Sequence, residues 1–155
     1  RRPKDQTEAY RAACVEFALR AAERDIALWV IGDAASPSFP RELAPFVGER
    51  RGAGELRLNL LVNYGWAWDL RTAVRAAAAE DTRGKAVTDL LASAGASRID
   101  LIVRWGGRRR LSGFLPVQSV YADFYVLDAL WPDFRMEHFH DALRWYQAQD
   151  VTLGG

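Results

Sequence analysis

The stretch SRIDLIVRWGGRRRLSG (97–113) runs from a predicted strand directly into a turn rich in glycine and arginine. The strand is predicted over 97–107, and its apolar side chains are Ile99, Leu101 and Val103 on one face and Ile102 on the other. The part that follows, RWGGRRRLSG (104–113), places four arginines and three glycines in ten positions. This junction of a strand with a charged turn indicates a sheet edge that holds a ligand.

Apolar runs on either side of this stretch alternate with helical patterns. The run IALWVIGD (26–33) is short, continuous and closed by Gly-Asp, which is typical of a parallel strand covered on both faces. The other elements expected are a helix through 10–21, a strand at 56–65, a short helix after Pro40, and helices at 68–80, 85–95 and 135–149. The pattern predicts an α/β fold, a mostly parallel sheet flanked by helices, in which ligands bind beyond the carboxyl ends of the strands.

The composition excludes several classes of protein. The 155 residues carry 21 basic and 20 acidic side chains, so no general positive field favours a nucleic acid as the partner. No apolar run reaches the roughly 18 residues that a membrane span needs. The single cysteine, Cys14, cannot form an internal disulfide, which favours a reducing, cytoplasmic setting.

The residues after the strand suit a small and strongly anionic ligand. Gly106 and Gly107 can adopt positive φ and let backbone N–H groups approach an anion. Arg104 and Arg110 flank the turn, so both guanidinium groups can converge on one phosphate or diphosphate. Ser112 can donate a further hydrogen bond and cap a helix that begins there. A solvated basic loop is the alternative interpretation.

Three stretches also carry a family resemblance: DLIVRWGGRRRLSGFLPVQSVYADFYVLDALWPDF (100–134), LNLLVNYGWAWDL (58–70) and RRPKDQTEAY (1–10). The first resembles the signature of the cis-prenyltransferases, the undecaprenyl diphosphate synthase family. The second is similar to that family's strand followed by asparagine-tyrosine-glycine, and the third to the end of its third motif. The resemblance implies the family's fold and an enzyme that condenses isopentenyl diphosphate onto an allylic prenyl diphosphate with cis geometry, using Mg²⁺ and a hydrophobic tunnel.

The resemblance also implies roles for the arginine and glycine residues. Arg104, Arg110 and Ser112 match the family's clamp for the diphosphate of isopentenyl diphosphate. Gly106 and Gly107 match the positions where its backbone approaches that group closely.

Two further positions match family residues, and others depart from them. Arg2 matches an arginine that helps to hold the allylic diphosphate, and Asp123 stands where the family has a glutamate that helps to bind Mg²⁺. Arg108 replaces an acidic residue that is common there, which implies either stronger diphosphate binding or a different acceptor. The other departures are Trp105 for a small residue, Gly113 for asparagine and Thr152 for the arginine of the terminal motif.

The family's first third, with an aspartate that is its main Mg²⁺ ligand, has no counterpart in the sequence. We therefore expect residues 1–155 to be the C-terminal portion of a single cis-prenyltransferase domain, completed by another segment of the protein or by a partner chain. The predicted function is prenyl transfer. The alternatives are a non-catalytic partner subunit of a heteromeric cis-prenyltransferase and an unrelated phosphate-binding module. A homodimer or heteromer is expected, with peripheral membrane contact for product release.

Most other noticeable residues favour structural roles. His138 and His140 lie two apart on a predicted helix, so they point away from each other and do not share a metal. Trp66 and Trp68 favour packing, with a tunnel wall as the alternative. Asp33 is expected to cap a turn.

One polar residue and one apolar strip carry further expectations. Asn63, at a strand end, either caps the following helix or lies near a substrate. An apolar strip resembles the family's dimer surface and consists of Tyr121, Phe124, Tyr125 and Trp131.

Overall fold

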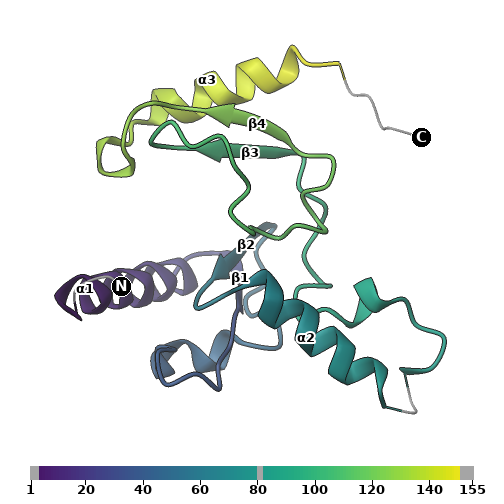
Figure 1. Ribbon diagram of the computed structural model, residues 1–155. Coiled ribbons are helices and arrows are strands. Elements are labelled where there is room, and N and C mark those ends of the chain that lie inside the picture. Colours follow the sequence, from purple (N-terminus) through teal and green to yellow (C-terminus); the bar gives the residue numbers. More distant parts are fainter. Residues whose placement is uncertain (1–3, 80–81, 151–155) are drawn as a thin grey trace. The chain divides into compact units, whose positions relative to one another are not determined.

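The computed structural model of the protein describes residues 4–79 and 82–150. The chain divides into two compact units, Arg1–Gly95 and Ala96–Gly155, called here the N-terminal unit and the C-terminal unit (Figure 1). That both belong to a single domain stays a prediction. Within the described ranges, no helix has the length and apolar character needed to cross a membrane.

The N-terminal unit is built on a parallel pair of strands, as predicted. Strand β1 (Ile26–Ile31) pairs with β2 (Leu56–Leu61) in a register that sets Ile26 opposite Leu56 and Ile31 opposite Leu61. The helices of this unit are α1 (Lys4–Ala22), the 3-10 helix η1 (Arg41–Phe46), α2 (Trp66–Ala77) and the 3-10 helix η3 (Val87–Leu90). Both α1 and η1 pack against β1, whereas α2 packs against η3.

The core of the N-terminal unit includes one face of β1. Leu28 and Val30 are fully buried and alternate with Trp29, which is half-buried. Ala18 of α1 belongs to the same apolar cluster, together with Phe39, Leu43 and Val62. The continuous apolar run of β1 therefore has the cover that a strand in a parallel sheet needs.

The C-terminal unit holds a second parallel pair. Strand β3 (Leu101–Arg104) pairs with β4 (Asp123–Val126), with Leu101 opposite Asp123 and Arg104 opposite Val126. Helix α3 (Met136–Gln147), preceded by the 3-10 helix η4 (Trp131–Asp133), packs along both strands (Figure 1). The helix expected at 135–149 is thus confirmed. Strand β4 is not among the predicted elements, because its four residues lie within a long apolar stretch.

The helix predicted at 85–95 is wrong. Only η3 forms there, and turns follow it. Ser93 is fully buried, its backbone N–H donates to Asp69 Oδ1 at 3.1 Å, and its hydroxyl donates to Asp69 Oδ2 at 2.5 Å. A serine N–H that binds a distant carboxylate is not available to close a helical turn.

The buried Asp69 joins three segments of the N-terminal unit. It lies in the first turn of α2 and also accepts a hydrogen bond from the Tyr64 hydroxyl at 2.9 Å. Tyr64 in turn packs edge-on against Trp68, with ring centroids 6.1 Å apart. Burial raises the pKa of Tyr64, and the hydrogen bond to Asp69 and the charge of that carboxylate raise it further.

The raised pKa of Tyr64 predicts a loss of stability at alkaline pH. A group whose pKa is higher in the folded protein stabilises the fold below its unfolded pKa, about 10 for tyrosine, and less as the pH rises above that value. The free energy of unfolding in urea should therefore fall above about pH 10, and Tyr64→Phe should make that fall less steep. Tyr121→Phe, at a half-exposed tyrosine, is the control. Equal slopes for Tyr64→Phe and the unchanged protein would contradict this account.

Candidate functional site

The turn after β3 is shaped by two glycines with positive φ. Gly106 and Gly107 have φ of 75° and 66°, the left-handed conformation expected of them. Their N–H groups donate to the carbonyl oxygens of Ala129 and Leu127, each at 2.8 Å. We predicted that these two N–H groups face an anion. They instead bind the segment that follows β4 and fix it against the turn.

Unused backbone donors lie a little further along the chain. From Arg108 to Gly113, no backbone N–H donates to a backbone carbonyl within the described residues. Ser112, Gly113 and Leu115 have φ of 55°, 75° and 38°. The helix predicted to begin near Ser112 is therefore wrong, since left-handed residues do not continue a right-handed helix. The stretch 108–113 instead leaves its N–H groups available, as anion-binding turns do.

The structure brings two of the predicted clamp residues together. Arg104, the last residue of β3, donates through Nη2 to Ser112 Oγ at 3.5 Å. Arg110 lies on the same loop but lines a cavity of about 590 Å³ that does not have Arg104 in its wall. The other residues lining this cavity are Arg109, Leu111, Phe124, Tyr125, Val126 and Trp145. Convergence of Arg110 with Arg104 on one ligand stays a prediction.

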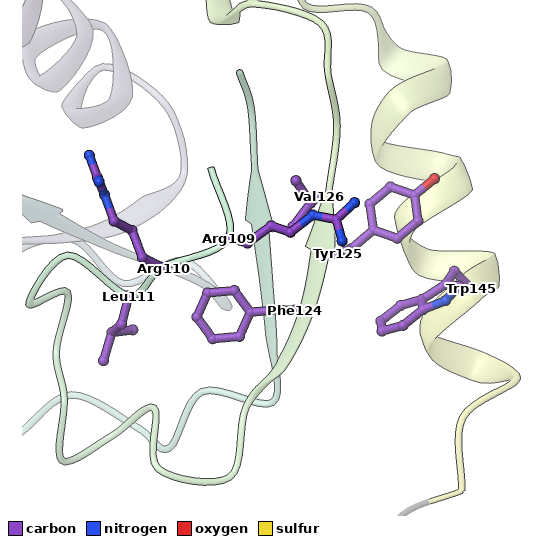
Figure 2. A pocket seen from close by; sticks show the side chains of 7 residues that line it. All are labelled: Arg109, Arg110, Leu111, Phe124, Tyr125, Val126 and Trp145. Carbon is purple, nitrogen blue, oxygen red and sulfur yellow. The ribbon is translucent and has the colours of Figure 1, made fainter. Parts of the chain in front are cut away.

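The cavity combines positive charge with an aromatic wall. Figure 2 shows Arg109 reaching across it toward Tyr125, whereas the Arg110 side chain extends in another direction. The rings of Tyr125 and Trp145 lie 5.4 Å apart and connect β4 with α3. Sequence reasoning did not single out Arg109 or Trp145. The run of three arginines could have pointed to Arg109 as an anion-binding residue. No sequence feature marked Trp145, apart from its place in a predicted helix.

Among the described residues, the four arginines of this loop have no acidic partner within ion-pair distance. In the described part of the chain, none of Arg104, Arg108, Arg109 and Arg110 forms an ion pair. Elsewhere in the described residues some arginines pair with carboxylates, in Arg11–Glu42, Arg20–Glu16, Arg51–Glu49, Arg98–Asp100 and Arg144–Asp141, whereas others such as Arg41, Arg57 and Arg71 do not. A cluster of arginines without ion pairs thus follows the carboxyl end of β3, which is where α/β sheets bind ligands.

The predicted metal ligand, Asp123, does not lie at this end of the strands. It begins β4 opposite Leu101, three positions before the pair formed by Arg104 and Val126, or about 10 Å along a strand. The described residues contain no group of three His, Cys, Asp or Glu side chains that could hold a metal ion. One carboxylate is a hard oxygen donor of the kind that Mg²⁺ prefers, but alone it is not a site. The described residues therefore do not fit a Mg²⁺ site of their own.

The remaining candidate residues have mostly structural contacts. Asn63, with φ of 52°, lies two residues after the end of β2 and donates through Nδ2 to the carbonyl oxygen of Asp33 at 3.3 Å. The Asp33 carboxylate accepts the N–H of Ala35 at 3.2 Å, which confirms its role in a turn. His138 Nδ1 accepts the N–H of Arg135 at 3.3 Å and so helps to begin α3.

The two tryptophans at the start of α2 differ in their packing. Trp66 is 53% exposed, so the packing role expected for it is wrong, whereas Trp68 packs against Tyr64. Arg2 and Thr152 lie outside the described residues.

Two solved structures share the fold of this chain. A lavandulyl diphosphate synthase from Lavandula x intermedia, solved with dimethylallyl diphosphate, matches with a TM-score of 0.81 and 24% identity, over 99% of this chain and 73% of that one. A probable undecaprenyl diphosphate synthase from Campylobacter jejuni matches with a TM-score of 0.80 and 23% identity, over 99% and 77%. The fold is that of the prenyl diphosphate synthases to which these structures belong, which confirms the predicted fold class.

The family follows from the sequence comparisons. The family model described as putative undecaprenyl diphosphate synthase matches residues 1–154, and the chain belongs to this family. An isoprenyl transferase from Nitrosomonas europaea is 36% identical, over 85% of this chain and 53% of its own length. A farnesyl-diphosphate-specific ditrans,polycis-undecaprenyl-diphosphate synthase from Aliivibrio fischeri is 30% identical, over 99% and 66%. The chain thus spans between half and two thirds of the length of these curated relatives.

The left-handed turn predicts how substitutions at Gly107 affect stability. An added Cβ would lie 3.1 Å from Asp128 Oδ1, and the positive φ costs an ordinary residue about 1–2 kcal/mol. Gly107→Ala should therefore lower the free energy of unfolding by about that amount, measured in urea. Gly107→Asn should lower it less, because asparagine tolerates this conformation. Equal losses for both variants would assign the effect to the Asp128 contact rather than to φ.

Proposed function

We propose that this chain binds isopentenyl diphosphate in a prenyltransferase that joins it to an allylic prenyl diphosphate with cis geometry. The observation that carries the proposal is that the loop 104–112 follows a parallel strand and holds, within the described residues, arginines without ion pairs and backbone N–H groups without backbone acceptors. The chain also belongs to this family. A diphosphate has the charge and the many acceptor oxygens that such a loop is suited to bind.

Each residue of the loop has a proposed role in holding the diphosphate. Arg104 and Ser112, already joined by a hydrogen bond, are proposed to bind one phosphate group, and Arg110 is proposed to bind the other. Gly106 and Gly107 are proposed to contribute by setting the turn from which these side chains project. Held in this way, isopentenyl diphosphate presents its C4 carbon to the allylic carbon as the diphosphate there departs, and a proton then leaves C2. The gain comes from positioning and electrostatics.

The allylic substrate is also a proposal for this chain. Curated relatives are named as synthases specific for farnesyl diphosphate, and a structural neighbour was solved with dimethylallyl diphosphate. An allylic prenyl diphosphate is the shared chemistry, and Arg2, outside the described residues, is the proposed contact from this chain. Mg²⁺ is implied by the resemblance, with Asp123 as one proposed ligand. Because the described residues do not fit a site of their own, the roles above are assigned to side chains alone.

The two alternative functions receive less support. Membership of the family argues against an unrelated phosphate-binding module. A non-catalytic partner subunit is not favoured, since the relatives are named as synthases and transferases.

We further propose that a second polypeptide covers part of the C-terminal unit. Of the strip predicted as a dimer surface, Tyr121 before β4 and Trp131 after it are 52% and 64% exposed, and Leu130 next to Trp131 is 61% exposed. Phe124 and Tyr125 are half-buried and line the cavity instead. Large exposed apolar side chains favour a protein partner. A homodimer or heteromer would provide this partner. Peripheral membrane contact for product release stays a prediction.

The proposal predicts the kinetics of three alanine variants. In an assay of radiolabelled isopentenyl diphosphate incorporation, Arg104→Ala, Arg110→Ala and Ser112→Ala should raise the KM for isopentenyl diphosphate, by about tenfold or more for each arginine. The assay should use several allylic primers, with and without a polypeptide that carries the N-terminal third of the family pattern. Arg144→Ala, at an exposed arginine paired with Asp141, is the control. An unchanged KM in the arginine variants of the active assembly would count against the assignment.

A further inference from the structure

We infer that Arg108 and Arg109 add to Arg104 and Arg110 enough positive charge for this chain to bind a diphosphate without a divalent cation. The inference rests on the proposed function, because it concerns the same loop. It goes further in stating which side chains neutralise the diphosphate and in what form the ligand is bound.

The unpaired charge of the loop is large for a nearly neutral chain. Four guanidinium groups lie within residues 104–110, and none of them forms an ion pair in the described part of the chain. A diphosphate carries several negative charges at neutral pH, and a divalent cation usually offsets part of that charge. Four arginines can offset it instead, since they stay protonated at every working pH.

Arg109 is placed to take part in this neutralisation. It lines the same cavity of about 590 Å³ as Arg110, and Figure 2 shows its side chain extending into the space before Tyr125. Because no carboxylate holds either arginine, both side chains are free to turn onto a ligand. Arg108 precedes them and, like them, is exposed, and the N–H groups of 108–113 supply further donors.

The predicted metal ligand lies away from this loop, where the carboxylate beside Gly107 is that of Asp128. Asp123 stands at the opposite end of the β3–β4 pair from Arg104, and the described residues hold no three-ligand cluster. A metal ion bound with the diphosphate would therefore find little support from these residues. It would also face the repulsion of four nearby positive charges, which a diphosphate free of metal would not.

The inference is tested by calorimetric titration of the 155-residue chain with isopentenyl diphosphate, in excess EDTA and in Mg²⁺. We expect the Kd values in the two conditions to agree within about threefold. Inorganic pyrophosphate, titrated in the same way, separates recognition of the diphosphate from recognition of the isopentenyl group. In EDTA, Arg109→Ala should weaken binding of both ligands by about tenfold, and Arg108→Ala/Arg109→Ala should weaken it further.

Matched variants and distinct outcomes make this test decisive. Arg109→Lys keeps the charge and should lose less affinity than Arg109→Ala, while Arg144→Ala on α3 removes one charge away from the loop and should bind normally. Circular dichroism establishes that each variant is folded. Binding in Mg²⁺ but not in EDTA would overturn this inference and leave the proposed function standing. Binding in neither condition would overturn both.

Discussion

The arrangement of the candidate site depends on the parallel pairing of β3 with β4 and on its continuation past the strand ends. The N–H of Leu127 donates to the Arg104 carbonyl at 2.8 Å, and the N–H of Gly107 then donates to the Leu127 carbonyl at the same distance. Gly106 continues the series to Ala129. Only glycine adopts this conformation readily, so the two glycines turn the chain while their N–H groups stay paired with the segment after β4. Of the arginines that follow, Arg109 and Arg110 line the cavity beside β4.

In this arrangement, charge contributes more to ligand binding at the site than the shape of the cavity does. Four arginines close together in sequence repel one another, and none of them forms an ion pair with a carboxylate of the described residues. Such a cluster destabilises the empty fold slightly and attracts anions over several ångströms. A bound diphosphate would remove the repulsion, so ligand binding and stability are coupled in this unit. The aromatic wall from Phe124 to Trp145 adds a region of lower polarity, in which charge–charge interactions are stronger than in water.

Several parts of this architecture follow from local sequence, whereas the positions of the site residues do not. The apolar run of β1 and the strand before Arg104 were predictable, because a buried parallel strand needs side chains of that kind. The helix expected at 85–95 fails because Ser93 binds Asp69, a residue 24 positions away that no local pattern reveals. Asp123 was placed near the arginines from its match to a family position. Its distance from them along the strand pair depends on a register between segments about twenty residues apart, which composition and periodicity do not determine.

The backbone of the loop adds a constraint that side chains alone do not express. Ser112 and Leu115 both have positive φ, which costs a residue other than glycine of the order of 1–3 kcal/mol and persists only where the surroundings impose it. Here they do. Leu115 is 3% exposed, its carbonyl accepts the N–H of Ser119 at 3.0 Å, and the Ser119 hydroxyl donates to the carbonyl of Phe114 at 3.2 Å. A buried leucine and a serine thus hold a strained turn in place. Ser112 is kept on the side of Arg104, where its hydroxyl accepts the guanidinium hydrogen bond and prepares this half of the clamp before any ligand arrives.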